Sequence, residues 1–152
     1  MTISMDLIKQ LREETGVSIA KCKEALEEAQ GDIGAAREIL KAYSSTAAEK
    51  KSDRALGAGR LFSYIHANKQ VGTLLELMCE TDFVSANEHF EQLGNDLALH
   101  ITAMGSTKEG ILEEPFVKNP EMTIQALVNE AIQKTGERID IGRIARFAVN
   151  QD

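Results

Sequence analysis

Apolar side chains recur with the 3.6-residue period of an α-helix in three stretches near the start of the chain. Each stretch begins at a residue whose side chain can cap a helix N-terminus, namely Ser4, Ser18 and Asp32. Gly16 can end the first helix, because glycine readily adopts the left-handed conformation that closes a helix. The pattern therefore predicts a three-helix module over residues 1–43, a compact bundle near the lower size limit for independent folding.

A polar, alanine-rich stretch over residues 44–59 interrupts this pattern and closes with Gly57 and Gly59. Such a composition is typical of a linker, so we expect a linker here, helical in part, between two domains. The second domain would comprise residues 60–152.

Beyond the linker the period of the pattern changes to two, which indicates β-strands. We expect one strand over residues 60–67, a turn at Asn68-Lys69 and a second strand over residues 70–79, together a β-hairpin. Alternation places five side chains of the second strand on one face: Val71, Thr73, Leu75, Leu77 and Cys79.

Two amphipathic helices are predicted next, separated by a loop that contains both prolines, Pro115 and Pro120. Their apolar stripes have the spacing of one helix face. The first stripe comprises Phe90, Leu93, Leu97, Ile101 and Met104, and the second comprises Ile124, Leu127, Val128, Ala131 and Ile132. Gly105 and Gly136 follow the stripes and can end the two helices.

A final strand is expected over residues 139–149. Strict alternation would place on one face Ile139, Ile141, Ala145, Phe147 and Val149, and on the other face Asp140, Gly142, Ile144 and Arg146. Two strands, two helices and a last strand predict the α+β class: an N-terminal three-helix bundle, then a three-stranded, mostly antiparallel sheet with helices on one face.

The charge of the chain narrows the range of ligands. Its 24 acidic and 17 basic residues give a net charge of −7, whereas nucleic acid and anionic membranes attract basic surfaces. The N-terminus lacks the basic and apolar regions of a signal peptide, and no run of about 18 apolar residues is present to span a bilayer. We therefore expect a cytoplasmic protein that binds another protein, with no nucleic-acid or membrane partner.

The sequence offers little material for catalysis. His89 and His100 lie 11 residues apart on one predicted helix, roughly 16 Å, which is too far for one metal ion. Surface positions are expected for all three histidines. Glu80 would raise the pKa of the neighbouring Cys79 thiol and weaken it as a nucleophile. We expect no metal, cofactor or catalytic residue, and we expect Cys22 and Cys79 to be reduced, buried thiols.

The segment Thr81-Asp82-Phe83-Val84 stands out, because a carboxylate and a large aromatic side chain follow the apolar strand at once. On the residues alone, two interpretations remain open. In one, Thr81 or Asp82 caps the next helix while Phe83 packs back onto that helix. In the other, Asp82 and Phe83 point outward as a probe for another protein.

At this segment the sequence resembles a known family. Two stretches, Leu11 to Leu26 and Glu76 to Ser85, are similar to the two signatures of the elongation factor Ts family and occur in the family's order. Residues 135–147 also look like the strand that follows the family's core helices. The resemblance covers nearly the whole chain.

The resemblance implies a UBA-like three-helix module, a dimerisation-type α+β core and a function as a guanine-nucleotide exchange factor rather than an enzyme. The implied partner is the translational GTPase elongation factor Tu, in its GDP-bound and nucleotide-free forms. The family's segment that dislocates the magnesium ion of this GTPase, and so releases GDP, matches Thr81, Asp82, Phe83 and Val84. The family's docking loop on the N-terminal module matches Arg12, Gly16, Ile19 and Ala20.

The sequence also departs from the family. Many members carry two core subdomains, whereas this chain is long enough for one, and Arg138 stands where many members have asparagine. Members with a single subdomain pair through their sheets, which makes residues 139–149 a candidate edge for a homodimer. Two other functions remain as alternatives: a UBA-like binding module without exchange activity, and a thiol hydrolase centred on Cys79.

Overall fold

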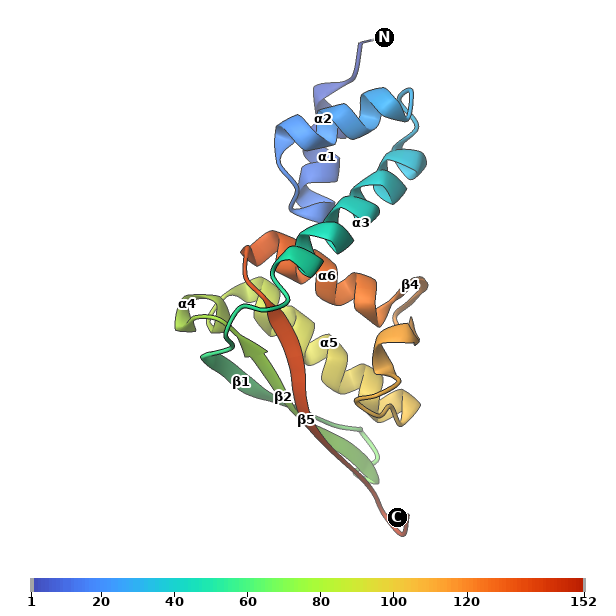
Figure 1. The fold of residues 1–152 in the computed structure, drawn as a ribbon. Helices are drawn as coiled ribbons and strands as arrows, with labels where there is room; N and C mark the ends of the chain where they lie inside the picture. Colours follow the sequence, from blue (N-terminus) through green and yellow to red (C-terminus); the bar gives the residue numbers. More distant parts are fainter. Residues whose placement is uncertain (1, 152) are drawn as a thin grey trace.

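A computed structural model describes residues 2–151 of the chain (Figure 1). Met1 and Asp152, the outer ends of the two predicted domains, lie outside the described residues. A helical bundle occupies one end of the molecule and a mixed helix-and-sheet unit occupies the other. The predicted α+β class is confirmed.

The bundle comprises α1 (Met5–Thr15), α2 (Ile19–Glu28) and α3 (Ile33–Lys50). All three predicted N-caps are confirmed: the side chains of Ser4, Ser18 and Asp32 accept hydrogen bonds from backbone N–H groups of the first helical turns. Gly16 closes α1 with a φ of 71°. The buried core of the bundle is small and apolar, built from Ile8, Leu11, Val17, Cys22, Ala25, Leu26, Ala36 and Leu40.

The third helix extends beyond its predicted end and reaches Lys50, so much of the stretch from residue 44 to residue 59 is helical. Ser44 is buried, and Ala48 packs against the core of the α+β unit. Figure 1 shows α3 passing alongside α6 (Ile124–Thr135). Alanine is the strongest helix former, and its small side chain lets the two helices approach. The bundle is therefore connected to the α+β unit by a continuous helix, followed by a short non-helical segment.

The main sheet comprises β1 (Ala58–Ile65), β2 (Val71–Cys79) and β5 (Ile139–Ala148), in the order β1-β2-β5 and antiparallel throughout. α5 (Glu88–Met104) and α6 cover one face of this sheet, as predicted. Gly94 of α5 lies directly against Phe62 of β1: a Cβ atom at position 94 would lie 2.3 Å from the Phe62 ring. Glycine is needed there because no side chain fits between helix and strand.

A β-bulge interrupts the pairing of β2 with β5. Leu75 pairs with Ile144 and Leu77 pairs with Ile141, so Glu76 faces two residues of β5, Gly142 and Arg143. The Glu76 carboxylate accepts a hydrogen bond from the backbone N–H of Arg143 at 3.0 Å, which satisfies a donor that the bulge removes from the ladder.

The bulge reverses the side-chain alternation of the last half of β5, so the predicted faces are wrong beyond Ile141. Ile144 packs against the core under the helices, and Arg146 donates two hydrogen bonds to the carbonyl of Thr102 in α5. Phe147 instead points to the opposite side and is 78% exposed. A single extra residue in one strand has this effect because the side-chain period of a strand is two.

The predicted proline loop contains regular structure: a short 3₁₀ helix η1 (Ile111–Glu113) and a two-stranded ribbon of β3 (Pro115–Phe116) and β4 (Asn119–Thr123). The expected surface position of His100 is also wrong, since its side chain is fully buried beneath this segment. Its Nδ1 accepts a hydrogen bond from the N–H of Val117 at 3.1 Å, so Nε2 carries the proton and donates to Glu114 at 2.8 Å. His100 thus pins the ribbon to α5.

Candidate functional site

The Thr81–Val84 segment forms the corner between β2 and a short helix, α4 (Asp82–Ser85). Thr81 is the N-cap of that helix: its Oγ1 accepts a hydrogen bond from the N–H of Val84 at 3.4 Å. The Ser85 hydroxyl donates to the carbonyl of Asp82 at 3.0 Å, which closes the single turn. The capping interpretation of Thr81 is therefore confirmed.

Phe83 and Asp82 point away from the protein. The Phe83 side chain is 91% exposed, so the interpretation in which it packs back onto the next helix is wrong. Val84 and Ser85 are buried and anchor the turn to the interior of the protein. Val84 thus belongs to the core of the α+β unit. An exposed phenyl ring forgoes the roughly 1.5–3 kcal/mol of stabilisation that burial of the ring would contribute. Such exposure is unusual for a large aromatic side chain.

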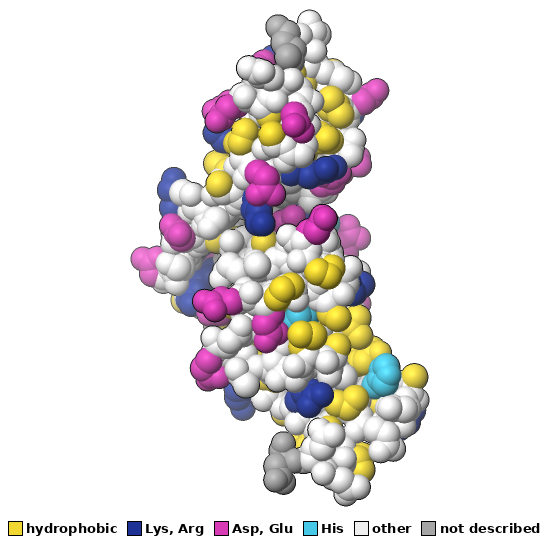
Figure 2. Space-filling view, turned by 90° about the vertical axis from the view of Figure 1, so that its right-hand side faces the viewer, with side chains coloured by type: hydrophobic (Ala, Val, Ile, Leu, Met, Phe, Trp, Pro, Cys, Tyr) yellow, Lys and Arg dark blue, Asp and Glu magenta, His cyan; other side chains and the backbone are white. Residues whose placement is uncertain are grey.

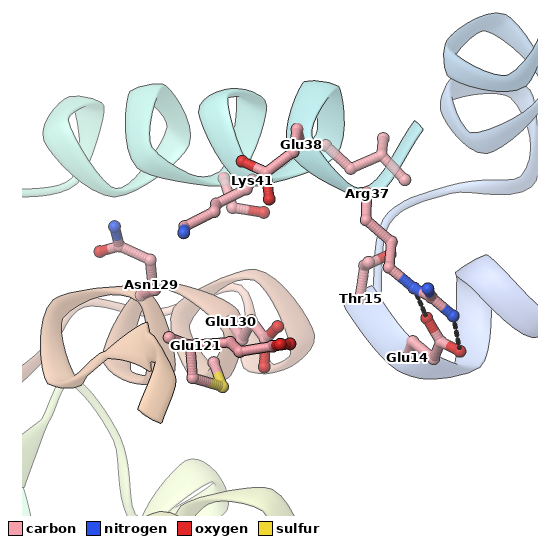
Figure 3. Close-up of a pocket in the computed structure, with 12 residues that line it drawn as sticks. Glu14, Thr15, Arg37, Glu38, Lys41, Glu121, Asn129 and Glu130 are labelled. Carbon is pink, nitrogen blue, oxygen red and sulfur yellow. Dashed lines mark hydrogen bonds and ion pairs between the residues drawn. The ribbon is translucent and has the colours of Figure 1, made fainter. Parts of the chain in front are cut away.

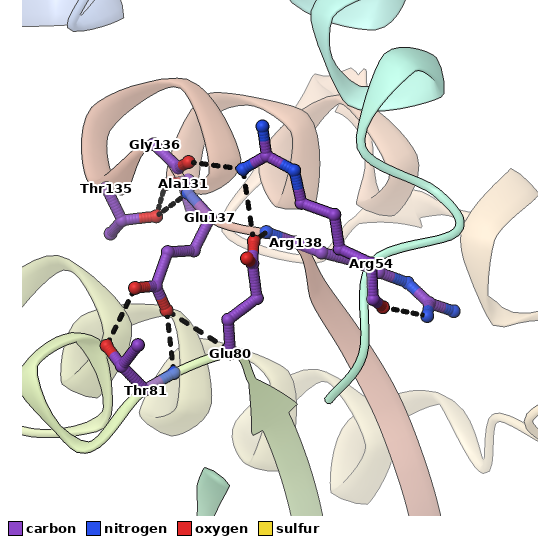
Figure 4. A network of polar contacts seen from close by, with 8 residues as sticks. All are labelled: Arg54, Glu80, Thr81, Ala131, Thr135, Gly136, Glu137 and Arg138. Atoms are coloured by element: carbon purple, nitrogen blue, oxygen red, sulfur yellow. Dashed lines mark hydrogen bonds and ion pairs between the residues drawn. The ribbon is translucent and has the colours of Figure 1, made fainter. Parts of the chain in front are cut away.

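Glu137 holds this corner from a distant part of the chain (Figure 4). Its Oε1 accepts hydrogen bonds from the backbone N–H groups of Glu80 and Thr81, at 3.1 and 2.9 Å. Its Oε2 accepts one from the hydroxyl of Thr81 at 2.7 Å. Glu137 is absent from the predicted site residues, because nothing in its local pattern indicates which backbone it binds. The one available signal is that it lies in the family-like stretch 135–147.

Glu80 and Arg138 add a second layer to the same network (Figure 4). The Glu80 carboxylate accepts from the backbone N–H of Arg138 and, at 3.5 Å, from the guanidinium of Arg54. The Arg138 guanidinium donates to the carbonyl of Arg54 at 2.7 Å and lies 3.3 Å from a carboxylate oxygen of Asp140. Arg138 therefore connects the segment after α3 to the start of β5.

Cys79 is a poor candidate for nucleophilic chemistry. Its thiol is fully buried and donates a weak hydrogen bond to the carbonyl of Thr81 at 3.3 Å. Burial, and then the negative charge of Glu137, raise the pKa of the Cys79 thiol, which lowers the fraction of reactive thiolate. Within residues 2–151, no three His, Cys, Asp or Glu side chains are grouped so that they could hold a metal ion.

The candidate residues of the N-terminal module lie around the turn between α1 and α2. Arg12, Ile19 and Ala20 are exposed, and the Ile19 side chain is 46% exposed despite being apolar. Gly16 instead approaches α6: a Cβ atom there would lie 2.4 Å from Cγ of Lys134. The C-terminal end of α6 therefore connects the two candidate regions, since Lys134 contacts the α1–α2 turn and Glu137, just beyond the helix, binds Thr81.

A charged hollow lies where the bundle meets α6 (Figure 3). On the bundle side, Arg37 binds Glu14 with two hydrogen bonds of 2.8 and 3.0 Å, and the hydrogen bonds from Arg37 lower the pKa of Glu14. On the α6 side, Glu130 is half-buried. Its burial raises its pKa, an effect that Lys134 opposes and Glu14 reinforces. The hollow is thus an electrostatic junction between the bundle and the α+β unit.

The sheet face opposite the helices is apolar and uncovered. Its exposed side chains, each about half exposed or more, are Leu61, Ile65, Leu74, Phe147 and Val149. Gly72 lies under Ile65, whose Cδ1 atom occupies the space that a Cβ at position 72 would fill. Contiguous exposed apolar patches on this scale mark interaction surfaces.

On the face shown in Figure 2, acidic and basic side chains alternate along the molecule, and Lys and Arg gather in no broad patch there. Among residues 2–151, no helix has both the length and the apolar composition that crossing a bilayer requires.

Comparison with known proteins bears on the same segments. A family model described as elongation factor TS matches residues 80–152, which include the corner at Thr81 and all of β5. The elongation factor Ts of Thermosipho melanesiensis is 35% identical over 195 residues, covering 98% of this chain and all of the relative. That of Thermotoga neapolitana is 35% identical over 196 residues and covers both chains completely.

The elongation factor Ts of Aquifex aeolicus is 40% identical over 153 residues, which span 97% of this chain and 53% of the relative. The alignments with the relatives from Thermosipho melanesiensis and Thermotoga neapolitana are longer than the 152 residues of this chain, so those relatives carry internal residues that this chain lacks. With such relatives aligned over nearly its entire length, this chain belongs to the elongation factor Ts family of translation elongation factors.

Proposed function

We propose that this protein is a guanine-nucleotide exchange factor, acting in the cytoplasm, that binds elongation factor Tu with GDP and accelerates the release of that GDP. The observation that carries the proposal is the 91% exposed phenyl ring of Phe83 on a turn whose other side is buried and hydrogen-bonded. A ring left bare on a firm support is suited to insertion into another protein.

The proposed mechanism is a wedge, with Phe83 and Asp82 acting together at the magnesium site of the GTPase. Burial of the phenyl ring in the partner would return about 1.5–3 kcal/mol. The Asp82 carboxylate would disturb the contacts around the magnesium ion by charge. Thr81 and Val84 serve this probe by capping and anchoring its turn. Loss of the cation removes the main counter-charge of the β-phosphate, so GDP dissociates faster.

Exchange of this kind requires no covalent chemistry from this chain. A factor that binds the nucleotide-free GTPase more tightly than the GDP-bound form weakens GDP binding by the same ratio, because the two binding equilibria are linked. GTP then displaces the factor by the same linkage.

We further propose that the bundle is a UBA-like module that supplies a second contact through the exposed residues Arg12, Ile19 and Ala20, with Gly16 shaping their turn. The end of α6 contacts both the α1–α2 turn and the Thr81 corner. Two contacts presented by one connected body bind more tightly than either alone, because the second forms at a high effective concentration.

The apolar outer face of the sheet supports a homodimer in which two copies cover each other's faces. β5 is an edge strand, and Phe147 near its C-terminal end is 78% exposed. The partner sheet would remove from water the side chains that the bulge directs outward.

Release of fluorescently labelled GDP from purified elongation factor Tu tests the proposal. Micromolar amounts of this protein should raise the release rate at least tenfold, and Phe83→Ala should remove most of that increase. Binding to the GTPase without faster GDP release would instead favour the alternative, a UBA-like binding module without exchange activity.

A further inference from the structure

We infer that Glu137 is the positioning residue of the Asp82–Phe83 probe. The inference deepens the proposed function and rests on it. Glu137 lies 56 residues from Thr81 in sequence, yet its carboxylate makes three hydrogen bonds to the turn that carries the probe.

The geometry of the carboxylate is specific to this turn. Oε1 lies 3.1 Å from the backbone nitrogen of Glu80 and 2.9 Å from that of Thr81. Both N–H groups come after the last paired residue of β2, so the sheet supplies no acceptor for them. Oε2 binds the Thr81 hydroxyl at 2.7 Å, the same hydroxyl that accepts from the N–H of Val84. One carboxylate thus fixes both the strand end and the N-cap.

Glu137 is itself held firmly. It follows Gly136, which closes α6 with a φ of 76°, and only Arg138 separates it from the start of β5. Its own N–H donates to the hydroxyl of Thr135, which in turn donates to the carbonyl of Ala131 (Figure 4). The support for the probe is therefore the junction of a packed helix and a paired strand.

The hold of Glu137 on the turn matters because Phe83 can act as a wedge only when the turn that carries it is rigid. A loose turn would have to be ordered on binding, and that entropy would be subtracted from the interaction with the partner. Removal of the Glu137 carboxylate should therefore slow the GDP-release step itself, with a smaller effect on docking of the N-terminal module. Glu137 acts through Phe83 and needs no contact of its own with the GTPase.

The test combines variants in a double-mutant cycle measured by labelled GDP release. Glu137→Ala should lower the maximal release rate about tenfold or more, whereas Glu137→Gln, whose side-chain oxygen can still accept from the two N–H groups, should retain most of it. In a Phe83→Ala background, Glu137→Ala should change the rate less than about twofold. Glu109→Ala, an exposed acid far from the turn, is the control for loss of a negative charge.

Equal losses from Glu137→Ala with and without Phe83 would overturn the inference, because they would mean that the residue acts elsewhere. Should Glu137→Ala fail to fold, Glu137→Asp, one methylene shorter, loosens the same bonds and takes its place in the cycle.

A second measurement separates this inference from the proposed function. Amide hydrogen exchange of the free protein should speed up at Glu80 and Thr81 in Glu137→Ala, while the amides of α5 stay protected. No GDP release by the unmodified protein would remove the proposed function yet leave this result standing. Unchanged exchange at both amides would remove the positioning role even if the unmodified protein is active.

Discussion

Phe83 and Val84 are adjacent in the chain, yet the first side chain is 91% exposed and the second only 7% exposed. The short helix α4 places them on different sides of the turn, since successive helical residues point about 100° apart. In the capped turn, Val84 therefore anchors the turn in the core and Phe83 is presented to solvent.

This division predicts unequal effects of two truncations on stability. Phe83→Ala should change the free energy of unfolding by less than about 0.5 kcal/mol, as expected for a surface position. Val84→Ala should lower it by about 2 kcal/mol through the cavity it leaves. Urea unfolding followed by circular dichroism measures both. A larger loss in Phe83→Ala than in Val84→Ala would mean that the ring packs on the protein after all.

The close approach of α5 and β1 predicts that Gly94→Ala is destabilising. Alanine favours helices over glycine by about 1 kcal/mol, but its Cβ would meet the Phe62 ring at 2.3 Å. Overpacking of this kind costs about 1–3 kcal/mol, so we expect a net loss in urea unfolding. A Phe62→Leu change in the same protein should recover part of that loss. Stabilisation by Gly94→Ala alone would show that the helix is free to move outward.

The junction between bundle and α6 predicts a pH-dependent effect of Glu130→Gln. Because the pKa of Glu130 in the folded protein is above its ordinary value of 4.5, the folded state favours the protonated form. Below pH 4.5 Glu130 is protonated in both the folded and the unfolded state, so it costs no stability. As the pH rises through the raised pKa, the carboxyl must ionise in the folded protein, and stability falls. Glu130→Gln should therefore stabilise the protein near neutral pH and lose this advantage at about pH 4.

Thermal unfolding of both proteins across this pH range measures the difference. Glu121→Gln, which changes an exposed acid that lines the same hollow, is the matched control for the loss of a negative charge there. An advantage of Glu130→Gln that grows toward acidic pH would contradict the burial of Glu130.

The uncovered sheet face predicts that one charge abolishes self-association. Sedimentation equilibrium at tens of micromolar should give the unmodified protein about twice its protomer mass of 16.7 kDa. Phe147→Glu should give a folded monomer, since its side chain is already 78% exposed in one copy. Met104→Glu, at an exposed apolar position on α5, should leave the dimer intact. A monomer in the unmodified protein would refute the homodimer.

Much of the architecture could be predicted because it is encoded locally. Helix stripes, N-caps at Ser4, Ser18 and Asp32, and closing glycines such as Gly16 depend on residues within a few positions of one another. The antiparallel hairpin of β1 and β2 is equally local.

The errors concern features that depend on distant partners. The bulge in β5 is fixed by Glu76 on another strand, so alternation within β5 cannot reveal it. His100 lies between Leu97 and Ile101 of the apolar stripe, and that position was the available signal for its burial. The segment after residue 43 was expected to be helical in part, but the extent of α3, to Lys50, depends on packing against the α+β unit and could not be predicted from the segment alone.

The candidate site likewise has a part that could be predicted from local sequence and a part that depends on distant residues. The segment from Thr81 to Val84 is conspicuous in sequence because an acid and an aromatic residue end an apolar strand. The side of the turn on which each residue lies, and the hold that Glu137 exerts on it, come from the tertiary fold.

The bulge at Gly142 and Arg143 makes the two-sided character of the last strand depend on pairing register rather than on composition. Deletion of one of these two residues would leave Phe147 on the outer face, because Ile144 would keep its pairing with Leu75. Closing the bulge with every residue retained would instead shift the rest of the strand by one residue, which turns Phe147 inward toward the helices and brings the cationic head of Arg146 to the outer face. Without a single apolar residue being replaced, such a shift would exchange an apolar surface for a charged one.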